Sequence, residues 1–234
     1  MELNRESVRP LLVVAIPEET KPLLRQLSRK GHRRSEAVAR GPFGREVRFE
    51  RVRVLSTGMG PNNAAAAFSA AVAAERPAWV VTAGIAGGLD PALRTGDGCF
   101  DVDPEFPRTA LLTSSGLTPG ISALVSRVAV TAAEKARLRA ETGARLVDME
   151  SAAIRQLARA EGIPSATVRT VSDTASEDLP LDFSTLVDAH QQLLPAKLAW
   201  AILRSPGKIP ALLRLQRSVS MATGRLATLL TELV

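Results

Sequence analysis

Apolar and polar residues follow one another along this chain in blocks that predict alternating strands and helices. Four short apolar runs, rich in Val, Leu and Ile, have the length of buried strands and lie at 11–16, 52–56, 79–82 and 166–171. Helical spacing of apolar residues follows each run or separates it from the next, at 17–27, 62–75, 134–140 and 151–161. Strands that alternate with helices predict a mostly parallel sheet.

The length of 234 residues and the hydrophobic content of 45% predict one folded domain with a full core. We expect an α/β fold: a central mixed, mostly parallel sheet flanked by helices. A further strand is expected at 45–49, and short β-like pieces at 111–112 and 128–130, whereas 28–45 is polar and contains glycine. The domain is expected to span 1–196, and a helical C-terminal segment 197–234.

The C-terminal segment, which we call the tail (197–234), carries most of the net charge. Its net charge is +5, whereas residues 1–196 carry only +1. A nearly neutral body argues against binding to nucleic acid. Trp200 and several leucines are interspersed with Lys and Arg, a pattern that suits an anionic membrane surface. Packing of the tail on the body or on another subunit would explain the same pattern.

Other composition features exclude several classes of site. Cys99 is the only cysteine, so no internal disulfide forms, and His32 and His190 stand alone without metal-ligand spacing. No apolar run approaches the roughly 18 residues of a membrane-spanning helix, and no secretory signal is visible at the N-terminus. We therefore expect a cytoplasmic protein without a metal or cofactor, with the tail as a peripheral contact to the inner face of the membrane.

Two carboxylates are placed to do chemistry at one edge of the predicted sheet. The strand at 166–171 delivers Ser172 and Asp173 to its carboxyl end, and Glu150 directly precedes the helix that leads into this strand. Open α/β sheets bind ligands at that edge. One carboxylate can hold sugar hydroxyls while the other contacts a base, as cleavage of an N-glycosidic bond requires. A pair of solvated loop acids would show the same spacing.

The sequence around these acids resembles the purine/uridine phosphorylase superfamily, which includes the nucleosidases that cleave methylthioadenosine and adenosylhomocysteine. Three blocks agree in family order: STGMGP at 56–61, TAGIAGGLDPALRTGD at 82–97 and VDMESAAIRQLARAEGIPSATVRTVSD at 147–173. The second block, ETGA at 141–144 and the basic tail look most like the hopanoid-associated phosphorylases. The glycines at 84–88 do not fit a dinucleotide-binding pattern.

The resemblance implies roles for six residues. Asp173 would stabilise the charge that develops on a departing purine, and Glu150 would bind the ribose hydroxyls. Ser172 and Arg169 would orient Asp173, while Met149 and Met59 would line the ribose pocket.

The nucleophile is the part of the pattern from which this sequence departs. Family nucleosidases carry a Glu after the first strand that activates water. Aligning the leucine pair at 23–24 with the family places Thr20 there, with Glu18 and Glu19 out of register. A missing base weakens the hydrolytic interpretation, since water needs activation and phosphate does not.

The phosphate ligands of some family phosphorylases are also replaced. Their Arg and Ser correspond to Thr82 and Ile85, so Ile85 is expected only to line the substrate site. Thr57 and the Gly58 backbone, in a glycine turn before a helix, are the phosphate ligands we predict, with Arg45 as an alternative. The segment that holds the base-stacking aromatic residue in relatives is shortened near 131–134.

The resulting prediction is cleavage of a purine nucleoside by inorganic phosphate as co-substrate, on a 5′-substituted adenosine such as adenosylhopane. Two alternatives stay open: hydrolysis of methylthioadenosine or adenosylhomocysteine, and nucleoside binding without turnover. Because family members are usually dimers or larger, a homo-oligomer is expected.

Overall fold

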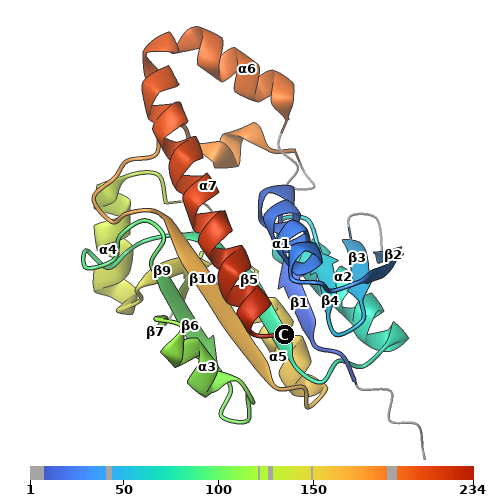
Figure 1. Cartoon of the computed structure of the whole chain (residues 1–234). Helices are drawn as coiled ribbons and strands as arrows, with labels where there is room; N and C mark the ends of the chain where they lie inside the picture. Colours follow the sequence, from blue (N-terminus) through green and yellow to red (C-terminus); the bar gives the residue numbers. More distant parts are fainter. Residues whose placement is uncertain (1–7, 41–43, 121, 126–128, 149, 189–193) are drawn as a thin grey trace, which may run out of the picture.

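A single α/β domain is built around one eight-stranded mixed sheet (Figure 1). The computed structural model describes residues 8–40, 44–120, 122–125, 129–148, 150–188 and 194–234. The strands are β1 (Leu11–Val14), β2 (Arg34–Arg40), β3 (Gly44–Phe49), β4 (Arg53–Ser56), β5 (Val80–Gly87), β6 (Gly98–Val102), β7 (Thr118–Pro119), β8 (Ser122–Leu124), β9 (Leu146–Asp148) and β10 (Ser165–Asp173). The helices are α1 (Pro17–Arg29), α2 (Pro61–Ala74), α3 (Thr109–Ser114), α4 (Ala132–Thr142), α5 (Ser151–Ala160), α6 (Pro195–Arg204) and α7 (Ile209–Glu232), with 3₁₀ turns η1 (Phe183–Leu186) and η2 (Pro206–Lys208).

The predicted mixed, mostly parallel sheet is confirmed. Its strand order is β2-β3-β4-β1-β5-β10-β6-β7, and the four central strands β4, β1, β5 and β10 run parallel. Antiparallel pairs border this centre, β2 and β3 on one side and β6 on the other. β8 and β9 form a separate parallel pair. The parallel centre brings the carboxyl ends of β1, β5 and β10 to one edge, where ligands of open α/β sheets bind.

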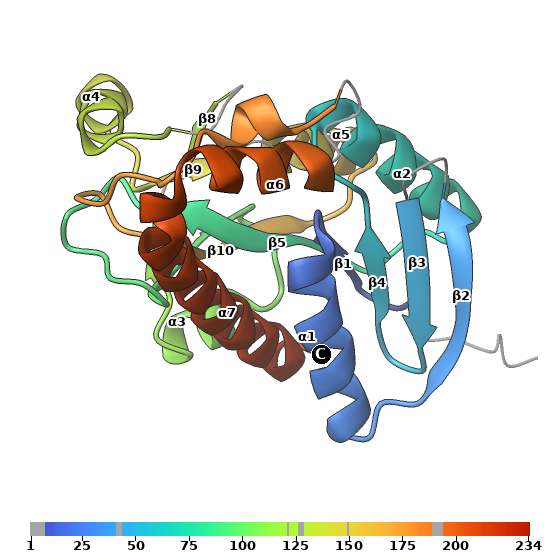
Figure 2. The same ribbon diagram turned by 90° about the horizontal axis from the view of Figure 1, so that it is seen from above.

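Helices cover both faces of the sheet, and alternate residues of each central strand point to opposite sides. In β1, Leu12 and Val14 pack in a cluster with residues of α1 and α7, whereas Leu11 and Val13 pack with residues of α2 and α5. Figure 2 shows α1 and α7 together on one side of the sheet and α2 with α5 on the other. Burial on both sides explains why these strands are continuous apolar runs.

Three elements differ from the prediction. The apolar pair at 111–112, expected to be β-like, lies in the short helix α3, since periodicity cannot distinguish a strand from a helix over so few residues. The strand predicted at 79–82 continues through the glycine-rich segment, so that Gly84–Gly87 belongs to β5. Part of the polar stretch 28–45 forms the edge strand β2, whose charged side chains suit an exposed edge.

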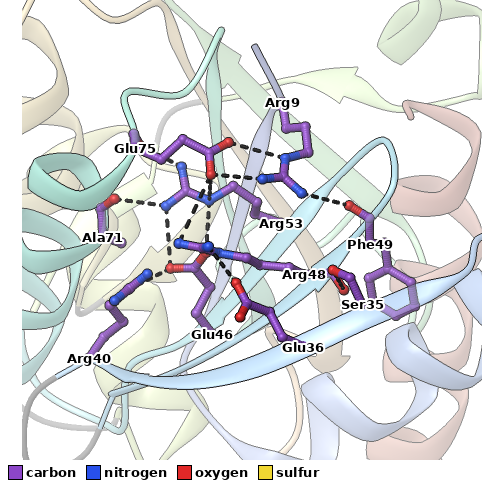
Figure 3. Close-up of polar contacts among 10 residues, drawn as sticks. All are labelled: Arg9, Ser35, Glu36, Arg40, Glu46, Arg48, Phe49, Arg53, Ala71 and Glu75. Atoms are coloured by element: carbon purple, nitrogen blue, oxygen red, sulfur yellow. Dashed lines mark hydrogen bonds and ion pairs between the residues drawn. The ribbon is translucent and has the colours of Figure 1, made fainter. Parts of the chain in front are cut away.

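A buried ion network ties the β2–β4 part of the sheet to α2 (Figure 3). Glu46 is completely buried on β3 and accepts hydrogen bonds from Arg40, Arg48 and Arg53 at 2.6–2.8 Å. Arg53, also buried, donates to the carbonyls of Ala71 and Glu75 at the end of α2. Burial alone would raise the pKa of Glu46, but the three guanidinium groups lower it to about 2.

The tail is helical, as predicted, and its two parts differ. The second half of α7 supplies buried residues such as Leu226 and Leu230 to the core. By contrast, residues 195–221 contain no buried side chain, and α6 stands away from the sheet (Figure 1). Pro210 lies in the first turn of α7 and does not break it. Within the described part of the chain, no helix is long and apolar enough to cross a membrane.

Candidate active site

A cavity of about 180 Å³ opens at the carboxyl ends of β5 and β10, beside the starts of α1 and α5. Its charged lining consists of four carboxylates and one guanidinium group. These are Glu19, Asp148, Glu150, Asp173 and Arg169. The predicted pair, Glu150 and Asp173, therefore share one cavity, and they are not solvated loop acids. Ile85 and Ser172, both predicted site residues, also line it.

Asp173 ends β10, and both of its carboxylate oxygens have partners. Oδ1 accepts a hydrogen bond from the Ser172 hydroxyl at 2.7 Å, and Oδ2 accepts one from Lys135 Nζ at 2.6 Å. Lys135 lies on α4 and is completely buried, and sequence reasoning missed it. Its position in a polar helix gave no signal, since only the fold brings α4 against the end of β10.

Glu150 is the residue that immediately precedes α5, and its carboxylate reaches the start of α2. Oε1 accepts a hydrogen bond from the backbone N–H of Gly60 at 3.2 Å. Gly60 has a φ of +93°, which allows the turn to present that N–H. Burial raises the pKa of Glu150, and the nearby Arg169 opposes this rise. The carboxylate is thus held at the cavity with its second oxygen open to a ligand donor.

Glu19, and not Thr20, is the carboxylate that follows the first strand and faces the cavity. It occupies the third position of α1, and Oε2 accepts from the backbone N–H groups of Ala15 and Ile16 at 3.0 and 3.2 Å. Oε1 accepts from the N–H of Ile85 at 2.9 Å. The register expected from the leucine pair was therefore wrong by one residue: Thr20 uses its hydroxyl to bond the Ile16 carbonyl within the helix.

The Glu19 carboxylate is buried, and this desolvation raises its pKa, an effect that Arg169 and the three backbone N–H groups partly oppose. A carboxylate with a raised pKa is a better proton acceptor than an exposed one. A glutamate at the third helical position commonly reaches back to the N-terminal backbone, and this capping pattern could have located it in the sequence.

Arg169 is the central cation of the cavity. Its Nη2 donates to Asp148 Oδ1 at 3.1 Å, whereas the buried Nη1 has no hydrogen-bond partner among the described residues. Burial would raise the pKa of Asp148, but Arg169 and the Ser151 hydroxyl hold it at about 2. Gly84 leaves room for the group: a Cβ there would lie 2.8 Å from Glu19 Oε1 and 2.9 Å from Arg169 Nη1.

The glycine turn contributes less than predicted. Thr57 and Gly58 do not line the cavity, and the Thr57 hydroxyl donates to the Gly58 carbonyl at 2.8 Å. Arg45 is exposed on β3 and Met59 is half-buried, and neither lines the cavity. Met149, predicted beneath the ribose, lies outside the described residues. Among the residues that the structure describes, no group of His, Cys, Asp and Glu side chains could hold a metal ion.

Comparisons with solved structures agree with this architecture. Native futalosine hydrolase of Helicobacter pylori is 18% identical, with 97% of each chain covered and a TM-score of 0.70. The 5′-methylthioadenosine/S-adenosylhomocysteine nucleosidase of H. pylori is 17% identical, with 95% of this chain and 96% of that chain covered and a TM-score of 0.67. The corresponding nucleosidase of Neisseria meningitidis is 20% identical, with coverage of 96% and 97% and a TM-score of 0.67. At these identities the likeness shows a shared fold.

No curated protein sequence matches the chain. A family model does: that of the phosphorylase superfamily matches residues 10–99 and 114–204. These ranges include the glycine turn at 58–60, Glu19 and the Glu150–Asp173 unit, so the match spans the cavity as well as the sheet. The chain belongs to the phosphorylase superfamily.

Proposed function

We propose that this protein hydrolyses the N-glycosidic bond of a purine nucleoside, with Glu19 as the base that activates water. The observation that supports this most directly is the buried Glu19 carboxylate, which lines the same cavity as Glu150 and Asp173. The solved structures of similar fold include futalosine hydrolase and methylthioadenosine/adenosylhomocysteine nucleosidases, whose names describe hydrolysis at nucleoside substrates.

Each carboxylate has a task in this reaction. Glu150 accepts hydrogen bonds from ribose hydroxyls, which strengthen as the sugar becomes oxocarbenium-like. The C1′–N9 bond breaks with its electron pair going to the purine, which Asp173 holds at the other end of the cavity. Water bonds to C1′ as its proton passes to Glu19. The products are a free base and a sugar with a hydroxyl at C1′.

Water is the nucleophile that the charges favour. Four carboxylates line the cavity, and a phosphate dianion would be placed near them. The N–H of Gly60, at the start of α2, is already bonded to Glu150. Phosphorolysis, our sequence-based prediction, stays the second candidate because Arg169 Nη1 is a buried donor without a partner among the described residues, a group that suits an anion.

The test is release of purine from adenosine and 5′-substituted adenosines, with and without inorganic phosphate. We expect release at the same rate in both conditions, with a free sugar as the second product. Release that requires phosphate and yields a sugar phosphate would establish the phosphorylase instead. Methylthioadenosine, adenosylhomocysteine and an adenosine with a large apolar 5′ group, such as adenosylhopane, probe the 5′ substituent. Binding without release from any of them would favour the non-catalytic alternative.

The exposed part of the tail supports a second proposal: α6 and the first half of α7 contact an anionic bilayer. Five of the six exposed large apolar residues of the described chain fall between 200 and 221, including Trp200 and Leu203, which is 79% exposed. Residues 195–217 carry five basic side chains and no acid. Like charges would oppose pairing of this surface with the same surface of a second copy, whereas anionic lipid complements it.

Co-sedimentation with vesicles tests this contact. We expect the full chain to bind phosphatidylglycerol vesicles more strongly than phosphatidylcholine vesicles, and the double variant Trp200→Ala/Leu203→Ala to bind more weakly. Val8→Ala, which removes an exposed apolar residue elsewhere, is the control. Equal binding by all three proteins would refute the contact. The expected homo-oligomer stays a prediction that sedimentation velocity can test.

A further inference from the structure

Lys135 is an unusual residue in this site because a fully buried ammonium group needs a complete set of partners. Its Nζ donates to Asp173 Oδ2 at 2.6 Å and to the carbonyl oxygens of Thr174 and Glu177, both at 2.8 Å. Three donors meeting three acceptors account for all the protons of an ammonium group. The geometry therefore describes Lys135 as a cation that is bonded on every side.

The partner of that cation must be an anion. Asp173 is 8% exposed, so an ionised carboxylate there requires a nearby positive charge. The Ser172 hydroxyl donates to its other oxygen at 2.7 Å. With both neighbours donating, Asp173 is an acceptor only, and it can offer a ligand nothing but lone pairs.

We propose that Lys135 is a positioning residue that selects the purine base: by holding Asp173 as an acceptor, it makes the site prefer a 6-amino purine over a 6-oxo purine. The proposal rests on the proposed function in placing a purine beside Asp173. A 6-amino group donates hydrogen bonds, whereas a 6-oxo group only accepts them. Next to an acceptor-only carboxylate, the 6-oxo purine leaves two acceptors facing each other.

The same pair has a consequence for departure of the base. The purine takes up negative charge as the C1′–N9 bond breaks, and an isolated carboxylate would oppose that change. The Lys135 charge offsets the Asp173 charge, so that the pair is neutral as a unit. Lys135 acts through Asp173 and touches neither substrate nor water in this role.

Lys135→Met is the variant that tests the proposal, since Met keeps the length and removes the charge. A buried carboxylate that has lost its cation neutralises by taking up a proton, and a protonated Asp173 can donate to a 6-oxo group. Lys135→Arg retains the charge and should retain more of the preference. Arg137→Met is the matched control, because Arg137 is an exposed cation on the same helix, paired only with Glu141.

Two readouts separate this proposal from the proposed function. The first is the ratio of kcat/KM for adenosine to that for inosine. The second is the ratio of affinities for free adenine and hypoxanthine by calorimetry, which requires no turnover. We expect both ratios to favour the 6-amino compound in the wild-type protein and in Arg137→Met. Both should fall by about 10- to 100-fold in Lys135→Met, since one mispaired buried hydrogen bond has an effect of that size.

The outcomes can be told apart. Turnover with ratios that Lys135→Met leaves unchanged would overturn the role of Lys135 and leave the proposed function standing. A wild-type protein that prefers adenine without any turnover, and a variant that loses this preference, would support Lys135 and refute the enzyme. Because each readout is a ratio, partial unfolding of Lys135→Met does not affect it. Wild-type protein that prefers the 6-oxo compounds would overturn the proposal directly.

Discussion

Replacement of Glu19 by Gln is the most informative perturbation of this site. The change keeps the size of the side chain and removes the charge that accepts the proton from water. Loss of a positioned general base lowers kcat by about 10²- to 10⁴-fold, equivalent to about 3–5 kcal/mol of transition-state stabilisation. We expect a decrease of that size in hydrolysis by Glu19→Gln. Glu18→Gln, an exposed neighbour on the same helix, should retain wild-type activity.

The contacts of Glu19 also predict a stability change. Its two oxygens accept three backbone N–H groups, one from Ile85 at Oε1 and two from Ala15 and Ile16 at Oε2. A Gln amide has one oxygen, so at least one of these donors loses its acceptor, at about 1–3 kcal/mol. We expect the melting temperature to fall by roughly 2–12 °C. Activity is therefore compared well below the melting temperature of the variant.

The pH profile gives the assay its second dimension. Burial raises the pKa of both Glu19 and Glu150, and both carboxylates must be ionised to act. The logarithm of kcat/KM should therefore fall with decreasing pH, above the ordinary carboxyl range, with a slope approaching two. In Glu19→Gln only Glu150 titrates, so the slope should be one. Full activity of Glu19→Gln, or an equal loss in Glu18→Gln, would refute the assignment of the base.

Three further predictions concern other parts of the structure. Glu46→Gln should lower the free energy of unfolding at pH 7 by about 3 kcal/mol, because the pKa of Glu46 falls from 4.5 to about 2 at about 1.4 kcal/mol per pKa unit. This difference should shrink in urea titrations as pH decreases from 4.5 towards 2; a constant difference would refute it. Gly84→Ala should lower kcat/KM at least tenfold, since its Cβ meets Glu19 and Arg169, whereas Gly207→Ala meets nothing within 4 Å and should not. Asp173→Asn should reduce kcat more than affinity if Asp173 stabilises the leaving base, and equal losses in kinetics and calorimetry would assign it to ground-state recognition.

The sheet and most helices could be predicted because their residues carry local signals. β1 and β10 are buried on both faces, so they read as continuous apolar runs, and Pro61 marks the start of α2. Short or polar elements gave no such signal. β2 exists because β3 offers it hydrogen-bond partners, and α3 is too short for its period to show.

The site divides in the same way. Glu150 and Asp173 belong to one contiguous unit of strand and helix, so their meeting at one edge of the sheet follows from sequence order. Glu19 was assigned to the wrong side of α1, because a shift of one residue rotates a helical side chain by about 100° and a leucine pair does not determine the register that closely.

What the sequence by itself determined is the α/β fold, the family resemblance and the two carboxylates at the carboxyl edge of the sheet, since each depends on residues close together in the chain. Only the tertiary structure decided which groups surround those carboxylates. Lys135 reaches Asp173 across 38 positions, and Gly60 reaches Glu150 across 90. Ile85 binds Glu19 across 66. Such contacts depend on how helices pack against strand ends, and they decide the charge and hydrogen-bonding state of each acid because desolvation and partner charges act through space.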